Sequence, residues 1–253
     1  MRLYRIQIEE VTGVLLAGKR AAKTKRNAAR GKERGERLSV RLFFYTVTLL
    51  LILLTFISIE LYAKGYTSLS SANFESSITL SLIFPFAVFS YLMAFRGQTF
   101  SFIVKGLGLT KDRLTKTAVY LGLLLFVALL ILEIGTGILE SVTGVQLPTN
   151  TFVVLQGAPI YFLLFGIFVA PINEEIFFRG FLVPRIGILL SAPIFAIFHI
   201  GYLSITEFAA ALIFGLLAGY VFKKSSSLYS TIIGHAAVNA LTIIAFLLLG
   251  GST

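Results

Sequence analysis

The stretch Pro171-Ile-Asn-Glu174-Glu175-Ile-Phe-Phe-Arg179-Gly180-Phe181 places two adjacent carboxylates and an arginine inside an apolar run. Residues 161–183 around it are otherwise almost entirely apolar and long enough to cross a bilayer as one helix. A charge at the bilayer centre costs at least about 2.5–3.5 kcal/mol on insertion scales. A segment that only had to span lipid would not carry these side chains, so the cluster predicts a functional site inside the membrane.

The composition of the whole chain predicts a polytopic membrane protein of the cell membrane. Hydrophobic residues make up 57% of the 253 residues, and the mean hydropathy is +0.89. Charged residues make up 13%, against about 25% in an ordinary globular domain. The chain has no cysteine, which excludes disulfides, thiolate nucleophiles and thiolate metal ligands.

Seven apolar segments of helical length predict an all-α fold with about seven transmembrane helices. In this prediction they cover residues 42–63, 76–95, 117–138, 160–181, 186–203, 205–222 and 228–249. The connecting segments alternate between the two sides of the membrane, and every lysine and arginine except Lys64 falls on one side. Because basic residues collect on the cytoplasmic side, we expect a cytoplasmic N-terminus and a C-terminus outside.

A basic N-terminal extension, residues 1–41, precedes one transmembrane helical domain, residues 42–253. Apolar residues recur at helical spacing within residues 3–16, and lysine, arginine, alanine and glycine dominate residues 17–41. Two interpretations stay open. The extension either binds anionic lipid headgroups as an amphipathic helix with a polybasic tract, or is a solvated tail that sets the topology. We expect no nucleic-acid partner.

The spacing of the embedded charges predicts which of them pair within one helix and which faces another helix. Glu175 and Arg179 are four residues apart, in the order that favours an ion pair on one helix face. Glu174 points about 100° away around the helix axis, so it is free to meet another helix.

Two later spans carry further polar residues that lipid would exclude. Phe195 and His199 are four residues apart, as are His235 and Asn239, so each pair is predicted to share a helix face. Any one of these residues alone is more typical of helix packing than of chemistry. Their joint occurrence with the carboxylates predicts a common cavity that opens toward the cytoplasm.

Three kinds of chemistry fit such a cavity. In the first, Glu174 is a general base that deprotonates water with help from His199, and His235 and Asn239 donate hydrogen bonds to an oxyanion. In the second, Glu174, His199 and His235 bind Zn²⁺, although the His-Glu-x-x-His signature of helical zinc proteases is absent. In the third, the cluster is the proton or cation relay of a transporter.

Three motifs occur in the order Glu174-Glu175-x-x-x-Arg179, Phe195-x-x-x-His199, His235-x-x-x-Asn239. This set resembles that of the CPBP family, which includes type II CAAX prenyl endopeptidases and proteins of bacteriocin processing and self-immunity. The resemblance covers about residues 158–250. It implies an intramembrane glutamate-type endopeptidase that acts on a membrane-associated protein or peptide, prenylated in the case of a true CAAX enzyme.

The resemblance also implies a role for each residue. Glu174 would activate water with His199, and His235 with Asn239 would form the oxyanion site. Glu175 and Arg179 would support them, and we expect Phe195 to contact substrate.

We expect no cofactor, with a divalent metal such as zinc as the alternative. A non-enzymatic bacteriocin self-immunity or scaffold protein that binds through the same cavity remains the alternative function.

Overall fold

The computed structural model describes residues 38–54, 56–57, 60, 64–65, 69–144, 155–200 and 204–250. Every regular element in these residues is a helix, which confirms the predicted all-α class. The chain divides into two compact units, Met1–Phe43 and Phe44–Thr253. The predictions for the basic extension, residues 1–41, lie almost entirely outside the described residues. All predicted site residues lie in the second unit.

Five helices of the described chain are long and apolar enough to cross a membrane. They are Phe74–Ala94, Lys116–Thr143, Ile160–Ile186, Ile205–Ser225 and Leu228–Leu249. Each overlaps a predicted span, so a multi-pass membrane protein is confirmed. The helices Leu38–Leu54 and Ile188–Ile197, which are shorter and apolar, lie in the other two predicted segments. With 10 residues, Ile188–Ile197 is too short to cross a bilayer, and the count of seven spans stays a prediction.

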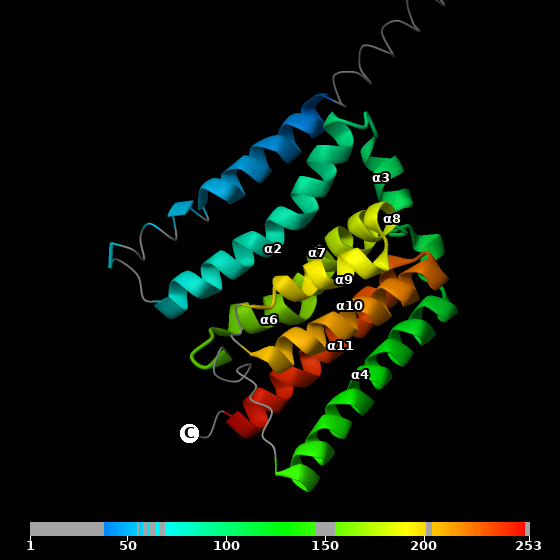
Figure 1. The fold of residues 1–253 in the computed structure, drawn as a ribbon. Coiled ribbons are helices and arrows are strands. Elements are labelled where there is room, and N and C mark those ends of the chain that lie inside the picture. Colours follow the sequence, from blue (N-terminus) through cyan, green and yellow to red (C-terminus); the bar gives the residue numbers. More distant parts are fainter. Residues whose placement is uncertain are drawn as a thin grey trace, which may run out of the picture. The chain divides into compact units, whose positions relative to one another are not determined.

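Figure 1 shows the described elements of the second unit, coloured in chain order. They are α2 (Leu69–Ala94), α3 (Phe100–Gly106), η1 (Lys111–Arg113), α4 (Lys116–Thr143), α6 (Ile160–Phe168), α7 (Ala170–Glu175), η2 (Ile176–Leu182), α8 (Val183–Ile186), α9 (Ile188–Ile197), α10 (Ile205–Ser225), α11 (Leu228–Ala245) and η4 (Phe246–Gly250). Helix α11 packs along α4, and α10 packs along α9. The elements that carry the three motifs meet through contacts of α11 with α7 and η2, and of α9 with η2.

Glycines explain the close approach of α11 to α4. A Cβ atom added at Gly122 would lie 2.6 Å from the carbonyl oxygen of Ser230, and one added at Gly234 would lie 2.9 Å from the carbonyl oxygen of Gly122. Only glycine fits at such separations, as is common where membrane helices pack closely. The small residue Gly234, next to His235, thus admits the backbone of another helix.

Glycines also allow the close approach of α10 to α9. A Cβ atom at Gly215 would lie 2.9 Å from Ala192, and one at Gly219 would lie 2.9 Å from the side chain of Ile188. The sequence Gly215-Leu-Leu-Ala-Gly219 therefore forms a small-residue packing face.

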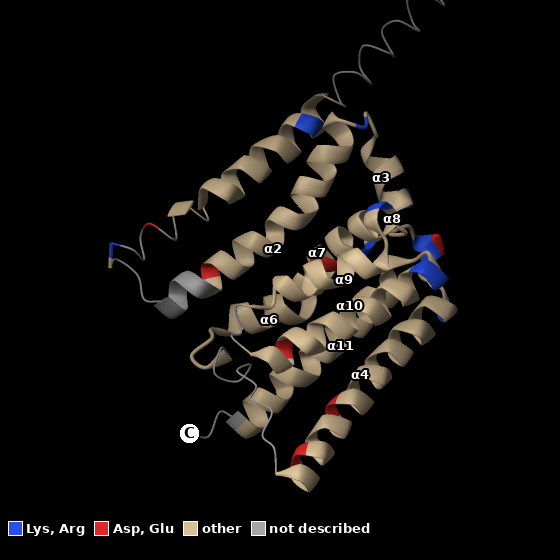
Figure 2. Ribbon diagram, viewed as in Figure 1, with Lys and Arg blue, Asp and Glu red and all other residues tan. Residues whose placement is uncertain are grey.

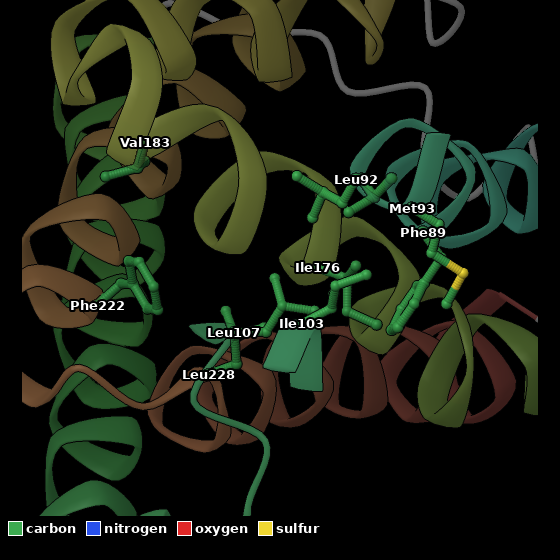
Figure 3. Packing of buried hydrophobic residues seen from close by; sticks show 10 residues of the cluster. Phe89, Leu92, Met93, Ile103, Leu107, Ile176, Val183, Phe222 and Leu228 are labelled. Atoms are coloured by element: carbon green, nitrogen blue, oxygen red, sulfur yellow. The ribbon is translucent and has the colours of Figure 1, made fainter. Parts of the chain in front are cut away.

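A cluster of buried apolar side chains ties α3 to the membrane helices. Figure 3 shows Ile103 of α3 and Leu107, the residue that follows α3, close to Ile176 of η2 and Leu228 of α11. All four are buried. A Cβ atom added at Gly180 would lie 2.5 Å from the side chain of Leu107, so the glycine after Arg179 makes room for that side chain.

Charge is distributed unevenly between the ends of the second unit. In Figure 2 most of its lysine and arginine lies near α3, α8 and the adjacent loops, whereas the acidic residues of α4 lie toward the opposite end. This distribution is the one expected when the basic end faces the cytoplasm. It supports the predicted orientation, which stays a prediction.

We predict that Gly122→Ala destabilises the protein by about 1–3 kcal/mol, because the new methyl group meets backbone that cannot move aside. The measurement is the temperature at which the monodisperse peak is lost in size-exclusion chromatography of the protein in detergent. Gly135→Ala is the matched control on the same helix, since nothing lies within 4 Å of its Cβ position. Equal loss of stability in the two variants would contradict close packing at Gly122.

Candidate active site

The segment that carries the carboxylates is not a uniform helix. Helix α6 ends at Phe168, α7 begins at Ala170, and a π-helix of 7 residues, η2, follows directly after Glu175. Pro171 has no backbone N–H and weakens the helix at the first junction. π-Helical turns are rare and occur mostly at functional sites. Sequence reasoning predicted one continuous helix over residues 160–181 and missed this change, because side-chain pattern does not distinguish the two helix types.

Glu175 lies at the centre of the site and is fully buried. Its Oε1 atom accepts a hydrogen bond from Nη1 of Arg179 at 2.8 Å and another from Nδ1 of His235 at 2.9 Å. The predicted pairing of Glu175 with Arg179 is therefore confirmed, and both side chains are 1% exposed or less. A carboxylate paired with arginine only accepts hydrogen bonds, so Nδ1 of His235 carries a hydrogen. This contact holds Nδ1 against Glu175, so Nε2 lies on the opposite, outward edge of the ring.

Glu174 faces the outward edge of that imidazole. Its Oε2 atom lies 3.9 Å from Nε2 of His235, and 19% of its side chain is exposed. Glu174 is thus directed at another helix, as its position around the helix axis predicted. It meets the histidine of α11, which the sequence had assigned to the same cavity.

Among the described residues, three buried side-chain nitrogen or oxygen atoms have no hydrogen-bond partner, and all three belong to Glu174, Glu175 and Arg179. They are Oε2 of Glu174, Oε2 of Glu175 and Nη2 of Arg179. A buried polar atom without a partner is costly and is usually satisfied by water or by a ligand. Their concentration here indicates where water or substrate would bind.

Phe195 joins the second motif to the other two. Its ring lies 4.5 Å from the His199 ring and 6.0 Å from the His235 ring, and Cζ of Arg179 lies 4.3 Å above its centre. Nδ1 of His199 lies 3.0 Å from the carbonyl oxygen of Phe195 and donates to it. His199 belongs to the turn that follows α9, not to a helix through residue 203 as predicted. Phe195 is 1% exposed, and its contact with substrate stays a prediction.

Asn239 points toward α6. Its Nδ2 atom donates to the carbonyl oxygen of Gly166 at 2.8 Å. This bond uses one of the two N–H groups of the amide and fixes the side chain between α11 and α6. Its assignment to the oxyanion site stays a prediction.

Sequence reasoning missed two residues of the site. Asn173 donates from Nδ2 to Oγ of Ser81 at 3.2 Å, which ties α7 to α2. Phe214 of α10 packs against both Arg179 and His235. Its ring centre lies 4.8 Å from Cζ of Arg179 and 4.6 Å from the centre of the His235 ring. Asn173 could have been found as a further polar residue of the first motif. Phe214 carried no signal, because a phenylalanine in an apolar helix is usually core.

The geometry does not form a metal centre. In the described part of the chain, no three histidine, aspartate or glutamate side chains lie together as a metal-ligand set. Glu174, His199 and His235, the ligands suggested by the sequence, therefore do not form one. Nδ1 of His235 is bonded to Glu175.

Membrane-length helices around a buried glutamate–arginine–histidine cluster define a polytopic membrane protein with a polar site in its interior. Residues 156–241 of this chain match the model of a protease family, described as type II CAAX prenyl endopeptidase Rce1-like. The matched segment contains every predicted site residue. The family resemblance inferred from the three motifs is therefore confirmed. No curated protein and no solved structure matches the chain.

We predict that Arg179→Met destabilises the protein by about 3–5 kcal/mol, because it leaves a buried carboxylate without its cation. Adding Glu175→Gln should restore part of that loss, since the charge is then removed as well. Thermal unfolding of the wild type, both single variants and the double variant in detergent measures the coupling. Strictly additive effects would contradict a buried ion pair.

Proposed function

We propose that the protein is an intramembrane endopeptidase in which Glu174 activates the water that hydrolyses a peptide bond. The observation that supports this most directly is the buried, unpartnered Oε2 of Glu174 opposite Nε2 of a histidine whose other nitrogen is held by a second carboxylate. Two atoms 3.9 Å apart can both reach one water at hydrogen-bond distance, about 2.6–3.2 Å. The match to a protease family supports the broad assignment of the protein as a hydrolase.

The proposed reaction uses the residues of the site as follows. Glu174 takes a proton from water as the water oxygen attacks the carbonyl carbon, and the carbonyl electrons move to the oxygen. His235, protonated at both nitrogens, donates from Nε2 to this oxyanion while Glu175 stabilises the imidazolium through Nδ1. The oxyanion then collapses, the C–N bond breaks, and the proton on Glu174 passes to the leaving amine.

The other residues hold this arrangement. Arg179 compensates the charge of Glu175 in a site that excludes bulk water. We assign His199 to the orientation of the water and the second N–H of Asn239 to the oxyanion. Phe195 separates the two imidazoles and would form part of the wall on which substrate lies.

We propose a membrane-associated protein or peptide as substrate, reached from the cytoplasmic side or laterally from lipid. The name of the matched family refers to prenylated CAAX proteins, so a prenylated C-terminal peptide is the first substrate to test. The bilayer and its anionic headgroups are the proposed partners of the basic N-terminus.

We predict that Glu174→Gln lowers the cleavage rate by at least about 10²-fold, the contribution typical of a general base. The assay uses protein in liposomes with a farnesylated fluorogenic peptide, and a comparison of membrane peptidomes from cells with either form. Glu133→Gln is the matched control on an exposed face of α4.

Cleavage by Glu174→Gln at nearly the wild-type rate would reject the proposal. If the variant cleaves nothing but keeps the full biological effect, the non-enzymatic binding function is favoured instead.

We also predict that hydrolysis does not depend on a metal, because the three candidate ligands do not form a ligand set. Purified active protein should contain zinc well below one equivalent and keep its activity after treatment with a chelator. Stoichiometric zinc, with activity lost on its removal and regained on its return, would show this prediction to be wrong.

A further inference from the structure

We propose that Phe214 is a positioning residue that holds Arg179 and His235 in the site. It lies on α10 and belongs to none of the three motifs. Its ring centre lies 4.8 Å from Cζ of Arg179 and 4.6 Å from the centre of the His235 ring. Phe214 therefore contacts both groups that donate hydrogen bonds to Oε1 of Glu175.

Arg179 lies against two aromatic rings. Phe195 faces its Cζ at 4.3 Å and Phe214 at 4.8 Å. The guanidinium is buried, makes its ion pair through Nη1, and has no hydrogen-bond partner at Nη2. The electron-rich faces of the rings supply part of the missing stabilisation, and such contacts are stronger away from water.

His235 needs a second contact because one hydrogen bond does not fix a ring. The bond from Nδ1 to Glu175 holds one nitrogen but allows the imidazole to turn about that bond. Phe214 packs against the ring at an angle of 57° between the two planes, nearer than Phe195 at 6.0 Å. This contact restricts the ring plane, and with it the direction of Nε2 toward Glu174.

The surroundings hold Phe214 itself in place. It is 6% exposed and packs in the buried cluster that contains Phe195, at 5.5 Å between ring centres. The next residue, Gly215, lies where a Cβ atom would be 2.9 Å from Ala192. The close contact of α10 with α9 thus sets the depth at which the Phe214 ring enters the site.

The catalytic part of this inference rests on the proposed function, so the test includes a measurement that needs no catalysis. The chain contains two histidines. The ring nitrogens of His235 can therefore be followed by NMR after ¹⁵N-histidine labelling, with His199→Gln to assign the signals.

The test compares Phe214→Leu with Phe84→Leu. Phe84 is 7% exposed and lies in the same buried cluster, where its ring packs on Phe177, Phe178 and Phe198. The two variants remove the same atoms from one cluster. Thermal unfolding measures the loss of packing in each, and Phe214→Tyr keeps the ring and should restore function.

We expect Phe214→Leu to shift or broaden the His235 ring signals and to lower kcat by about 10- to 100-fold, the scale of a slightly misplaced catalytic group. KM should change by less than about twofold, since the residue does not bind substrate. Phe84→Leu should leave the His235 signals and kcat near wild type.

The inference is overturned if both leucine variants change the signals and kcat in proportion to their loss of stability, or if Phe214→Leu changes neither. If Phe214→Leu does not fold, Phe214→Met and Phe214→Tyr replace it, and equal behaviour of these two would overturn the inference. A wild-type protein that cleaves no peptide would end the proposed function, while the His235 signals would still decide the role of Phe214.

Discussion

One carboxylate oxygen organises the interior of this protein. Oε1 of Glu175 accepts hydrogen bonds from Arg179 and from His235, and all three side chains are buried. A buried charge is tolerated only when it is paired and hydrogen-bonded, so each of the three depends on the other two. Nε2 of His235 then lies on the side of Glu174, whose buried Oε2 atom has no hydrogen-bond partner.

The helix packing makes this contact possible. Gly122 and Gly234 let α11 lie close against α4 and so set the position of His235. Gly215 does the same for α10 and α9, which bring Phe214 and Phe195 to the guanidinium. Inside lipid the hydrophobic effect does not drive helices together, so close van der Waals packing of their backbones holds them in contact. Small residues next to the site allow this packing.

The imidazole of His235 is oriented by a carboxylate on one side and faces a second carboxylate on the other. In this respect it follows the principle of catalytic triads, in which an acid fixes the ring and stabilises its protonated form. The low dielectric of the membrane interior strengthens these interactions and makes their geometry more demanding. The Phe214 ring packs on the imidazole at 4.6 Å between ring centres, and in our proposal it orients the ring together with the bond to Glu175.

The sequence alone determined the all-helical membrane class, the five long spans, the three motifs and the pairing of Glu175 with Arg179, because hydropathy and the spacing of four residues act locally along a helix. It did not determine which atoms face one another across helices. The bond from His235 to Glu175, the contact of Phe214, the bond from Asn239 to Gly166 and the π-helix after Glu175 were decided by tertiary structure. The physical reason is that each depends on the depth and rotation at which separate helices pack, and a one-dimensional pattern does not record either quantity.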